Sequence, residues 1–81
     1  MSKAAEIRSP LPGVFYRKPS PESPPFKNDG DTVVADEVVG LIEVMKSFHE
    51  VRAGVAGAGI RFVVDDADAV MAGQTLAEVQ Q

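Results

Sequence analysis

The chain has 81 residues and a formal net charge of −4, and it contains no cysteine and one histidine. This composition disfavours nucleic-acid binding, which needs a basic surface, and it provides no thiolate or histidine cluster for a metal. No apolar run approaches the ~20 residues of a membrane span, and no signal peptide is evident. We therefore expect one small soluble domain in the cytoplasm, with any functional site displayed on its surface because so short a chain has little core to spare.

Residues 1–6 carry no pattern, so we expect a flexible N-terminus there and one domain over residues 7–81. The domain contains short β-branched and aromatic runs separated by Gly, Pro and Asp, which is typical of strands joined by turns. The predicted strands are 14–16, 33–34, 38–44, 60–64 and 76–79. The alanine-containing stretch 66–78 has weak helical periodicity and includes Gly73, which favours two short strands. The sequence therefore predicts an all-β fold.

The two halves of the chain repeat one another. Arg8 matches Arg52 and Gly13 matches Gly57 at one constant separation. At a second, shorter separation the matched pairs are Val33 with Val70, Ala35 with Ala72, Val39 with Leu76 and Ile42 with Val79. Such a repeat predicts two similar β layers packed face to face around one core. The change in separation places an insertion in the first half, before Val33.

The insertion contains a proline-rich segment over about residues 18–26. Its four prolines have no backbone N–H to donate to a sheet, so we expect the segment to leave the sheet as a stiff, protruding loop. A surface loop without a function is the alternative.

Between the halves, two apolar segments flank Met45-Lys46. A tight hairpin over about residues 43–50 would place Lys46 at or beside its turn, exposed and on a rigid element. An enzyme that acylates one lysine among several can recognise that presentation, and the amide formed would remove the lysine charge. The residues alone also allow a plain, solvated lysine.

Three segments together resemble the biotin carboxyl carrier family of bacterial acetyl-CoA carboxylase. Residues 7–17 resemble its opening strand, residues 19–26 its protruding thumb, and Glu43-Val44-Met45-Lys46 its Glu-Ala-Met-Lys biotinylation signature. The likeness runs from about residue 7 to residue 79. It implies a flattened barrel-sandwich of two four-stranded antiparallel sheets with quasi-twofold symmetry, the biotinyl/lipoyl fold.

The resemblance also implies a function. Biotin would be attached covalently to Lys46, with Glu43, Met45 and Ser47 forming the recognition segment around it. A thumb with Pro21, Glu22 and Ser23 at its tip would contact the biotin.

The chain would catalyse nothing itself. A biotin protein ligase would load it, a biotin carboxylase would add the carboxyl group, and a carboxyltransferase would pass that group to an acyl-CoA, for fatty acid biosynthesis if the acceptor is acetyl-CoA. No Pro- and Ala-rich tether precedes the domain, so we expect a free-standing short carrier if Met1 is the true start.

The sequence departs from the family pattern at Val44, where the family has Ala, and at Ser47, where it has Met or Leu. These departures keep an unmodified interaction module open as an alternative. A lipoyl carrier is a second alternative, although Met45 and the thumb argue against it. A small enzyme is disfavoured because His49 has no nucleophile or orienting carboxylate in a recognisable arrangement.

Overall fold

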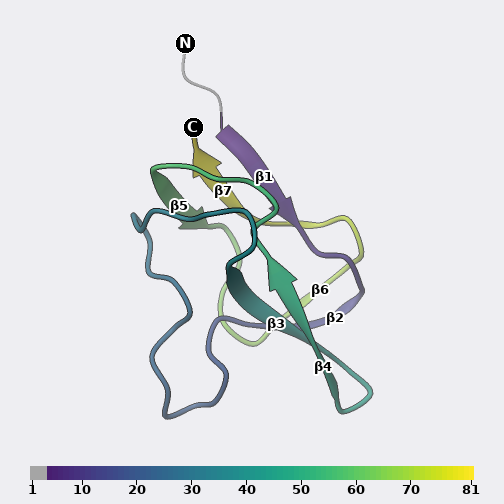
Figure 1. The fold of residues 1–81 in the computed structure, drawn as a ribbon. Coiled ribbons are helices and arrows are strands. Elements are labelled where there is room, and N and C mark those ends of the chain that lie inside the picture. The colour runs from purple at the N-terminus through teal and green to yellow at the C-terminus, as the bar shows by residue number, and fades with distance from the viewer. Residues whose placement is uncertain (1–3) are drawn as a thin grey trace.

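The structure, a computed structural model that describes residues 4–81, contains seven β-strands and no helix among those residues (Figure 1). The strands are β1 (Ala4–Arg8), β2 (Gly13–Tyr16), β3 (Val38–Val44), β4 (Ser47–Arg52), β5 (Gly59–Phe62), β6 (Asp68–Val70) and β7 (Thr75–Gln80). They form two antiparallel sheets, ordered β4-β3-β2-β6 and β1-β7-β5. The predicted all-β, two-layer fold is confirmed. The described residues include no helix long and apolar enough to cross a membrane.

The hydrophobic core lies between the two sheets. Phe15 and Ile42 project from one sheet, and Ile60 and Leu76 from the other, and all four side chains are almost completely buried. Alternation along each strand explains this placement, because every second side chain points to the same face. Full burial of each such side chain contributes about 1.5–3 kcal/mol relative to exposure.

The sequence repeat appears in the structure as two equivalent strand pairings. Gly13 pairs with Val70, and Val33 pairs with Gly57. Since the repeat equates Gly13 with Gly57 and Val33 with Val70, each pairing becomes the other when the halves are exchanged. The two halves are therefore related by a quasi-twofold symmetry.

The strand predicted over residues 33–34 differs from the structure, in which Val33 forms only an isolated bridge. A local turn prevents the strand from continuing. The Val34 N–H donates to Oε1 of Glu37 at 2.8 Å, and the Val34 carbonyl accepts from the Glu37 N–H at 3.1 Å. Both backbone groups of Val34 are thereby occupied. The second sheet has three continuous strands, where the family fold predicts four.

The prediction of a flexible terminus over residues 1–6 is wrong for Ala4–Glu6. These residues form the start of β1 and pair with β7, with Ala4 opposite Gln80 and Glu6 opposite Glu78. The pairing satisfies backbone groups at the edge of β7, and the buried side chain of Ile7 anchors the strand. The prediction for residues 1–3 lies outside the described residues.

The stretch 66–78 forms β6 and the start of β7, as the two-strand interpretation predicts. The turn between these strands includes Gly73 at a φ of 82°, a conformation that favours glycine.

Candidate attachment site

The turn between β3 and β4 contains only Met45 and Lys46. The last residue pair of the hairpin joins Val44 to Ser47, so two residues complete the connection. Met45 has a φ of 49° and Lys46 a φ of 68°. Two consecutive positive φ values are the signature of a type I′ turn, whose twist matches that of the flanking strands.

This turn holds two residues in a conformation that non-glycine residues avoid. A left-handed backbone costs a non-glycine residue roughly 1–2 kcal/mol, and Asn-Gly is the pair that adopts this turn most easily. Here the rigid β3–β4 ladder imposes the turn on a methionine and a lysine. Such local strain is often concentrated at functional positions.

The Lys46 side chain is exposed at the end of the hairpin. Met45 is 94% exposed, and Lys46 and Ser47 are also exposed. None of the ion pairs or side-chain hydrogen bonds found within residues 4–81 involves Lys46. In Figure 1 the turn lies at the opposite end of the molecule from the start of β1 and the end of β7. The amine is therefore accessible to another protein.

Glu43 connects the hairpin to β2 through Tyr16. The Tyr16 hydroxyl donates to Oε1 of Glu43 at 3.1 Å, and the Tyr16 ring lies 6.2 Å from the ring of Phe48 between centroids. The hydrogen bond to the Glu43 carboxylate is the main reason why the pKa of Tyr16 is raised above its ordinary value of 10.0, with burial adding to the effect. Glu43, Tyr16 and Phe48 thus form one cluster on the outer face of the four-stranded sheet.

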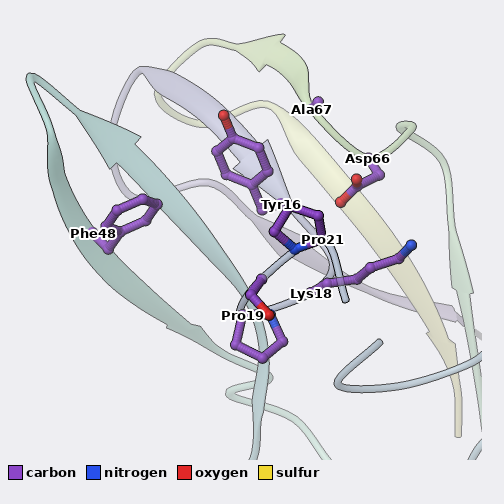
Figure 2. Close-up of a pocket in the computed structure, with 8 residues that line it drawn as sticks. Tyr16, Lys18, Pro19, Pro21, Phe48, Asp66 and Ala67 are labelled. Atoms are coloured by element: carbon purple, nitrogen blue, oxygen red, sulfur yellow. The ribbon is translucent and has the colours of Figure 1, made fainter. Parts of the chain in front are cut away.

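Tyr16 and Phe48 of this cluster form one wall of a pocket of about 450 Å³ (Figure 2). The pocket is lined by β2, the thumb (residues 18–26), β4 and the loop between β5 and β6. Its lining residues are Tyr16, Lys18, Pro19, Ser20, Pro21, Phe48, Asp66 and Ala67. This volume is within the range of small-molecule sites, and the aromatic rings and prolines make its walls mostly apolar.

The predicted thumb residues take three different places. Pro21 lines the pocket, whereas Glu22 is exposed and is not among the lining residues. The Ser23 N–H donates to the carbonyl of Ser20 at 3.1 Å, and the two hydroxyls lie 2.7 Å apart. Ser23 therefore stabilises the thumb internally.

Sequence reasoning missed Tyr16, Phe48 and Asp66 as pocket residues. One signal was present, because Tyr16 follows the buried Phe15 and strand alternation points it to the outer face. Phe48 lies just beyond the turn, opposite Glu43. Nothing local predicts that Asp66 meets them, since it comes from a loop far away in the chain.

Two antiparallel sheets related by quasi-twofold symmetry, with an exposed lysine on a two-residue hairpin turn, define the class of biotinyl and lipoyl attachment domains. The sequence profile of the family described as "Biotin-requiring enzyme" matches residues 5–79. The chain belongs to this family.

Curated relatives agree with the resemblance found in the residues. The chain is 46% identical over 70 residues to the biotin carboxyl carrier protein of acetyl-CoA carboxylase from Chlamydia trachomatis, a match that covers 86% of this chain and 43% of the relative. It is 47% identical over 70 residues to the protein of that name from Chlamydia muridarum, with the same coverage. The chloroplastic protein of Glycine max is 37% identical over 79 residues, or 98% of this chain and 30% of the relative. The chain thus spans less than half the length of these relatives, and its likeness to the carrier family is confirmed.

The site residues fit covalently attached biotin. An amide bond needs an accessible amine, which the exposed turn provides at Lys46. The pocket beside the hairpin is of a size and apolarity suited to a small ring system. No group of three or more potential metal ligands occurs in the described part of the chain.

Proposed function

We propose that Lys46 carries biotin through an amide bond and that the chain is the carrier domain of an acetyl-CoA carboxylase-like, biotin-dependent carboxylase. The observation that carries the proposal is the two-residue turn that displays Lys46, in a chain that belongs to the biotin-requiring family. The names of the relatives support the assignment to acetyl-CoA carboxylase.

Biotin, when bound, supplies a ureido nitrogen that accepts a carboxyl group and later releases it. The protein's own residues supply position and mobility. The strained turn fixes the position of the Lys46 backbone, and the flexible aliphatic part of the side chain lets an attached group move. The pocket between the thumb and the Tyr16–Phe48 pair offers a resting place near the hairpin.

The proposal assigns all catalysis to partner enzymes. A biotin protein ligase would acylate Lys46, and a biotin carboxylase and a carboxyltransferase would each bind the hairpin in turn, in the cytoplasm. Glu43, Met45 and Ser47 are the residues that we expect the ligase to recognise beside the lysine. The exposed Met45 and Ser47 are accessible for a direct contact, whereas the Glu43 carboxylate is hydrogen-bonded to Tyr16.

The intact mass of the protein, after co-expression with a biotin ligase and added biotin, tests the assignment. We expect a single biotin adduct on the wild type and none on Lys46→Arg. Lys18→Arg is the matched control, because it changes another lysine near the same pocket and should keep the adduct.

Each other outcome contradicts the proposal in a specific way. An adduct formed only with a lipoate ligase would identify a lipoyl carrier. A folded protein that no active ligase modifies would indicate an unmodified interaction module. An adduct that persists in Lys46→Arg would place the site on another lysine.

A further inference from the structure

The thumb has few hydrogen bonds of its own. Those found over residues 18–25 join Ser20 to Ser23, and four prolines in the thumb have no N–H to donate. At the base, the Phe26 N–H donates to the Arg17 carbonyl at 2.9 Å and closes the loop. The position of the thumb over the pocket therefore depends on what holds the residues at this base.

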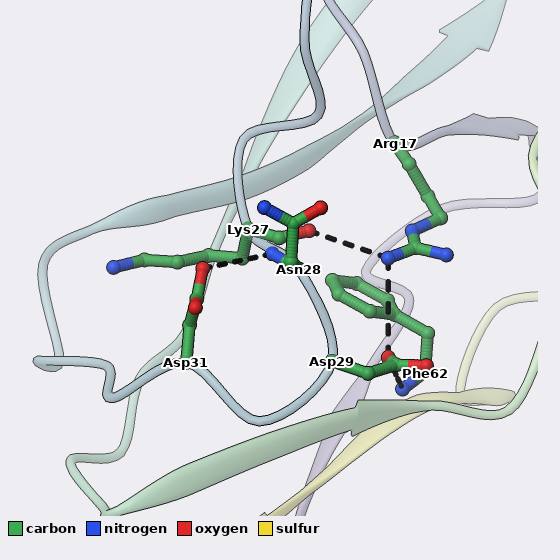
Figure 3. A network of polar contacts seen from close by, with 6 residues as sticks. All are labelled: Arg17, Lys27, Asn28, Asp29, Asp31 and Phe62. Atoms are coloured by element: carbon green, nitrogen blue, oxygen red, sulfur yellow. Dashed lines mark hydrogen bonds and ion pairs between the residues drawn. The ribbon is translucent and has the colours of Figure 1, made fainter.

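The Arg17 side chain contacts two other segments there, the end of β5 and the chain that leaves the thumb (Figure 3). Its guanidinium carbon lies 4.1 Å from the ring centroid of Phe62. One Nη donates to the carbonyl of Lys27 at 3.3 Å and lies 3.9 Å from a carboxylate oxygen of Asp29. The planar guanidinium thus links β2, the end of β5 and the chain that leaves the thumb. Arg17 precedes the thumb and Lys27 follows it, so one side chain joins its two ends.

Comparison of the two symmetry-related halves shows which contacts of Arg17 belong to the fold in general and which belong to the thumb. The Arg17 N–H donates to Oδ1 of Asp66 at 2.7 Å, and the Phe62 N–H donates to Oδ1 of Asp29 at 3.0 Å. Arg17 and Phe62 therefore occupy equivalent positions in the two halves. The backbone N–H to aspartate hydrogen bond is a feature of each half. The thumb follows only Arg17, and only Arg17 carries a guanidinium that reaches across the thumb's base.

The burial of Arg17 supports a positional role. The side chain is 23% exposed, and its Nε is buried without a hydrogen-bond partner in the described structure. In solvent, water would satisfy all five N–H donors of the guanidinium. The stack on Phe62 and the two contacts at the thumb's base hold Arg17 in place although one donor goes unpaired. A lysine there would retain the charge but lack the planar group that stacks.

We propose that Arg17, stacked on Phe62, is the positioning residue that holds the thumb over the Tyr16–Phe48 pocket. Any effect of Arg17 on biotin attached to Lys46 rests on the proposed function, whereas its effect on the position of the thumb does not. Because Tyr16 and Lys18, on either side of Arg17 in the chain, both line the pocket, a displaced Arg17 would change the pocket on the thumb side.

Amide order parameters from NMR relaxation, measured on the unloaded protein, test this inference. In the wild type we expect values of about 0.85 at Glu22 and Ser23, as in a rigid backbone. In Arg17→Lys and in Phe62→Leu they should fall below about 0.6, the range of flexible segments. Hydrogen exchange at the Phe26 amide should become faster in both variants. Arg61→Lys is the matched control, because Arg61 is 72% exposed and pairs with Glu78, and the thumb should keep its order in that variant.

The amides of β3 distinguish a local effect from a general one. They should keep wild-type order parameters in Arg17→Lys, and the melting temperature should change little. Wild-type thumb order in Arg17→Lys would overturn the proposal, as would an equal loss of order throughout β3. If Phe62→Leu fails to fold, the order parameters of the thumb in Arg17→Lys are sufficient to test the proposal. If no ligase biotinylates the wild type, the proposed function is contradicted, but the order parameters of the thumb still test the role of Arg17.

Discussion

Gly13 and Gly57 occupy equivalent positions in the two halves of the domain, and each lies directly against the backbone of the neighbouring strand in its own sheet. A Cβ on Gly13 would collide with the carbonyl oxygen of Glu43, and a Cβ on Gly57 with that of Gln80. The side chains in the way, Ile42 and Val79, are also matched by the repeat. The glycines therefore allow the close approach on which the quasi-twofold barrel depends.

Alanine at either glycine should destabilise the fold. We expect Gly13→Ala and Gly57→Ala each to lower the free energy of unfolding by about 1–3 kcal/mol, as in other overpacked sites. Urea denaturation measures the change. Gly59→Ala is the control, because the nearest atom to its added Cβ is the Gly30 carbonyl oxygen at 3.8 Å. Equal stability of the Gly57 and Gly59 variants would contradict this account of the barrel.

The sequence predicts those features that depend on local chemistry. Glycine positions and β-branched runs indicate two similar halves, and the apolar segments around Met45-Lys46 indicate the hairpin. The turn type follows less directly, since neither Met45 nor Lys46 has the preference of Asn-Gly for positive φ. There the β3–β4 ladder overrides the local preference.

Features that depend on distant segments could not be predicted in the same way. Residues 4–6 have no strand pattern, and they become part of β1 only because β7 offers a partner. The pocket could not be predicted either, because Phe48 and Asp66 come together with the thumb only in the folded structure. Val34 has a strand-like side chain, but the nearby carboxylate of Glu37 binds its N–H and ends the pairing.

The turn at Lys46 should be more stable with residues that favour positive φ. The double variant Met45→Asn, Lys46→Gly should raise the free energy of unfolding by roughly 1 kcal/mol, a gain typical of optimised turns. Lys46→Arg, which keeps a long side chain in the same conformation, should leave stability unchanged. Both should lose the biotin adduct. Thermal melts compare the three proteins, and a less stable double variant would show that the turn is not strained.

Glu37 should make the stability depend on pH. Lys27 donates to its carboxylate across 2.7 Å, and together with the Val34 N–H it lowers the pKa of Glu37 below its ordinary value of 4.5. The stabilisation is thus complete above pH 4.5 and is lost as the pH falls through the lower pKa of the folded state.

Glu37→Gln tests this contribution. Gln74, the equivalent residue in the other half, accepts the Met71 N–H through Oε1 at 2.9 Å, so glutamine can preserve the turn. Melting temperatures from neutral pH down to about pH 3 should show the wild type to be the more stable protein at neutral pH, with the difference shrinking as acid protonates Glu37. A difference that does not vary with pH would mean that the Lys27–Glu37 pair contributes nothing.

Tyr16 reports directly on the cluster beside the hairpin, because it is the only tyrosine in the chain. Its pKa is raised above 10.0 mainly by the hydrogen bond to Glu43, which favours the neutral hydroxyl. Glu43→Gln keeps an acceptor but removes the charge, so the tyrosinate absorbance should appear at lower pH than in the wild type. Glu50→Gln, on the neighbouring strand β4, should leave the titration unchanged.

The same bond predicts the direction of the alkaline stability change. Since the folded-state pKa of Tyr16 lies above the unfolded value, the stabilisation is complete below pH 10.0 and is lost as the pH rises through the folded-state value. The advantage of the wild type over Glu43→Gln should therefore shrink in alkali. An unchanged Tyr16 titration in Glu43→Gln would show that Glu43 is not held by Tyr16 in solution. Glu43 would then be free to contact a partner directly, and Tyr16 would lack its hydrogen bond to the hairpin.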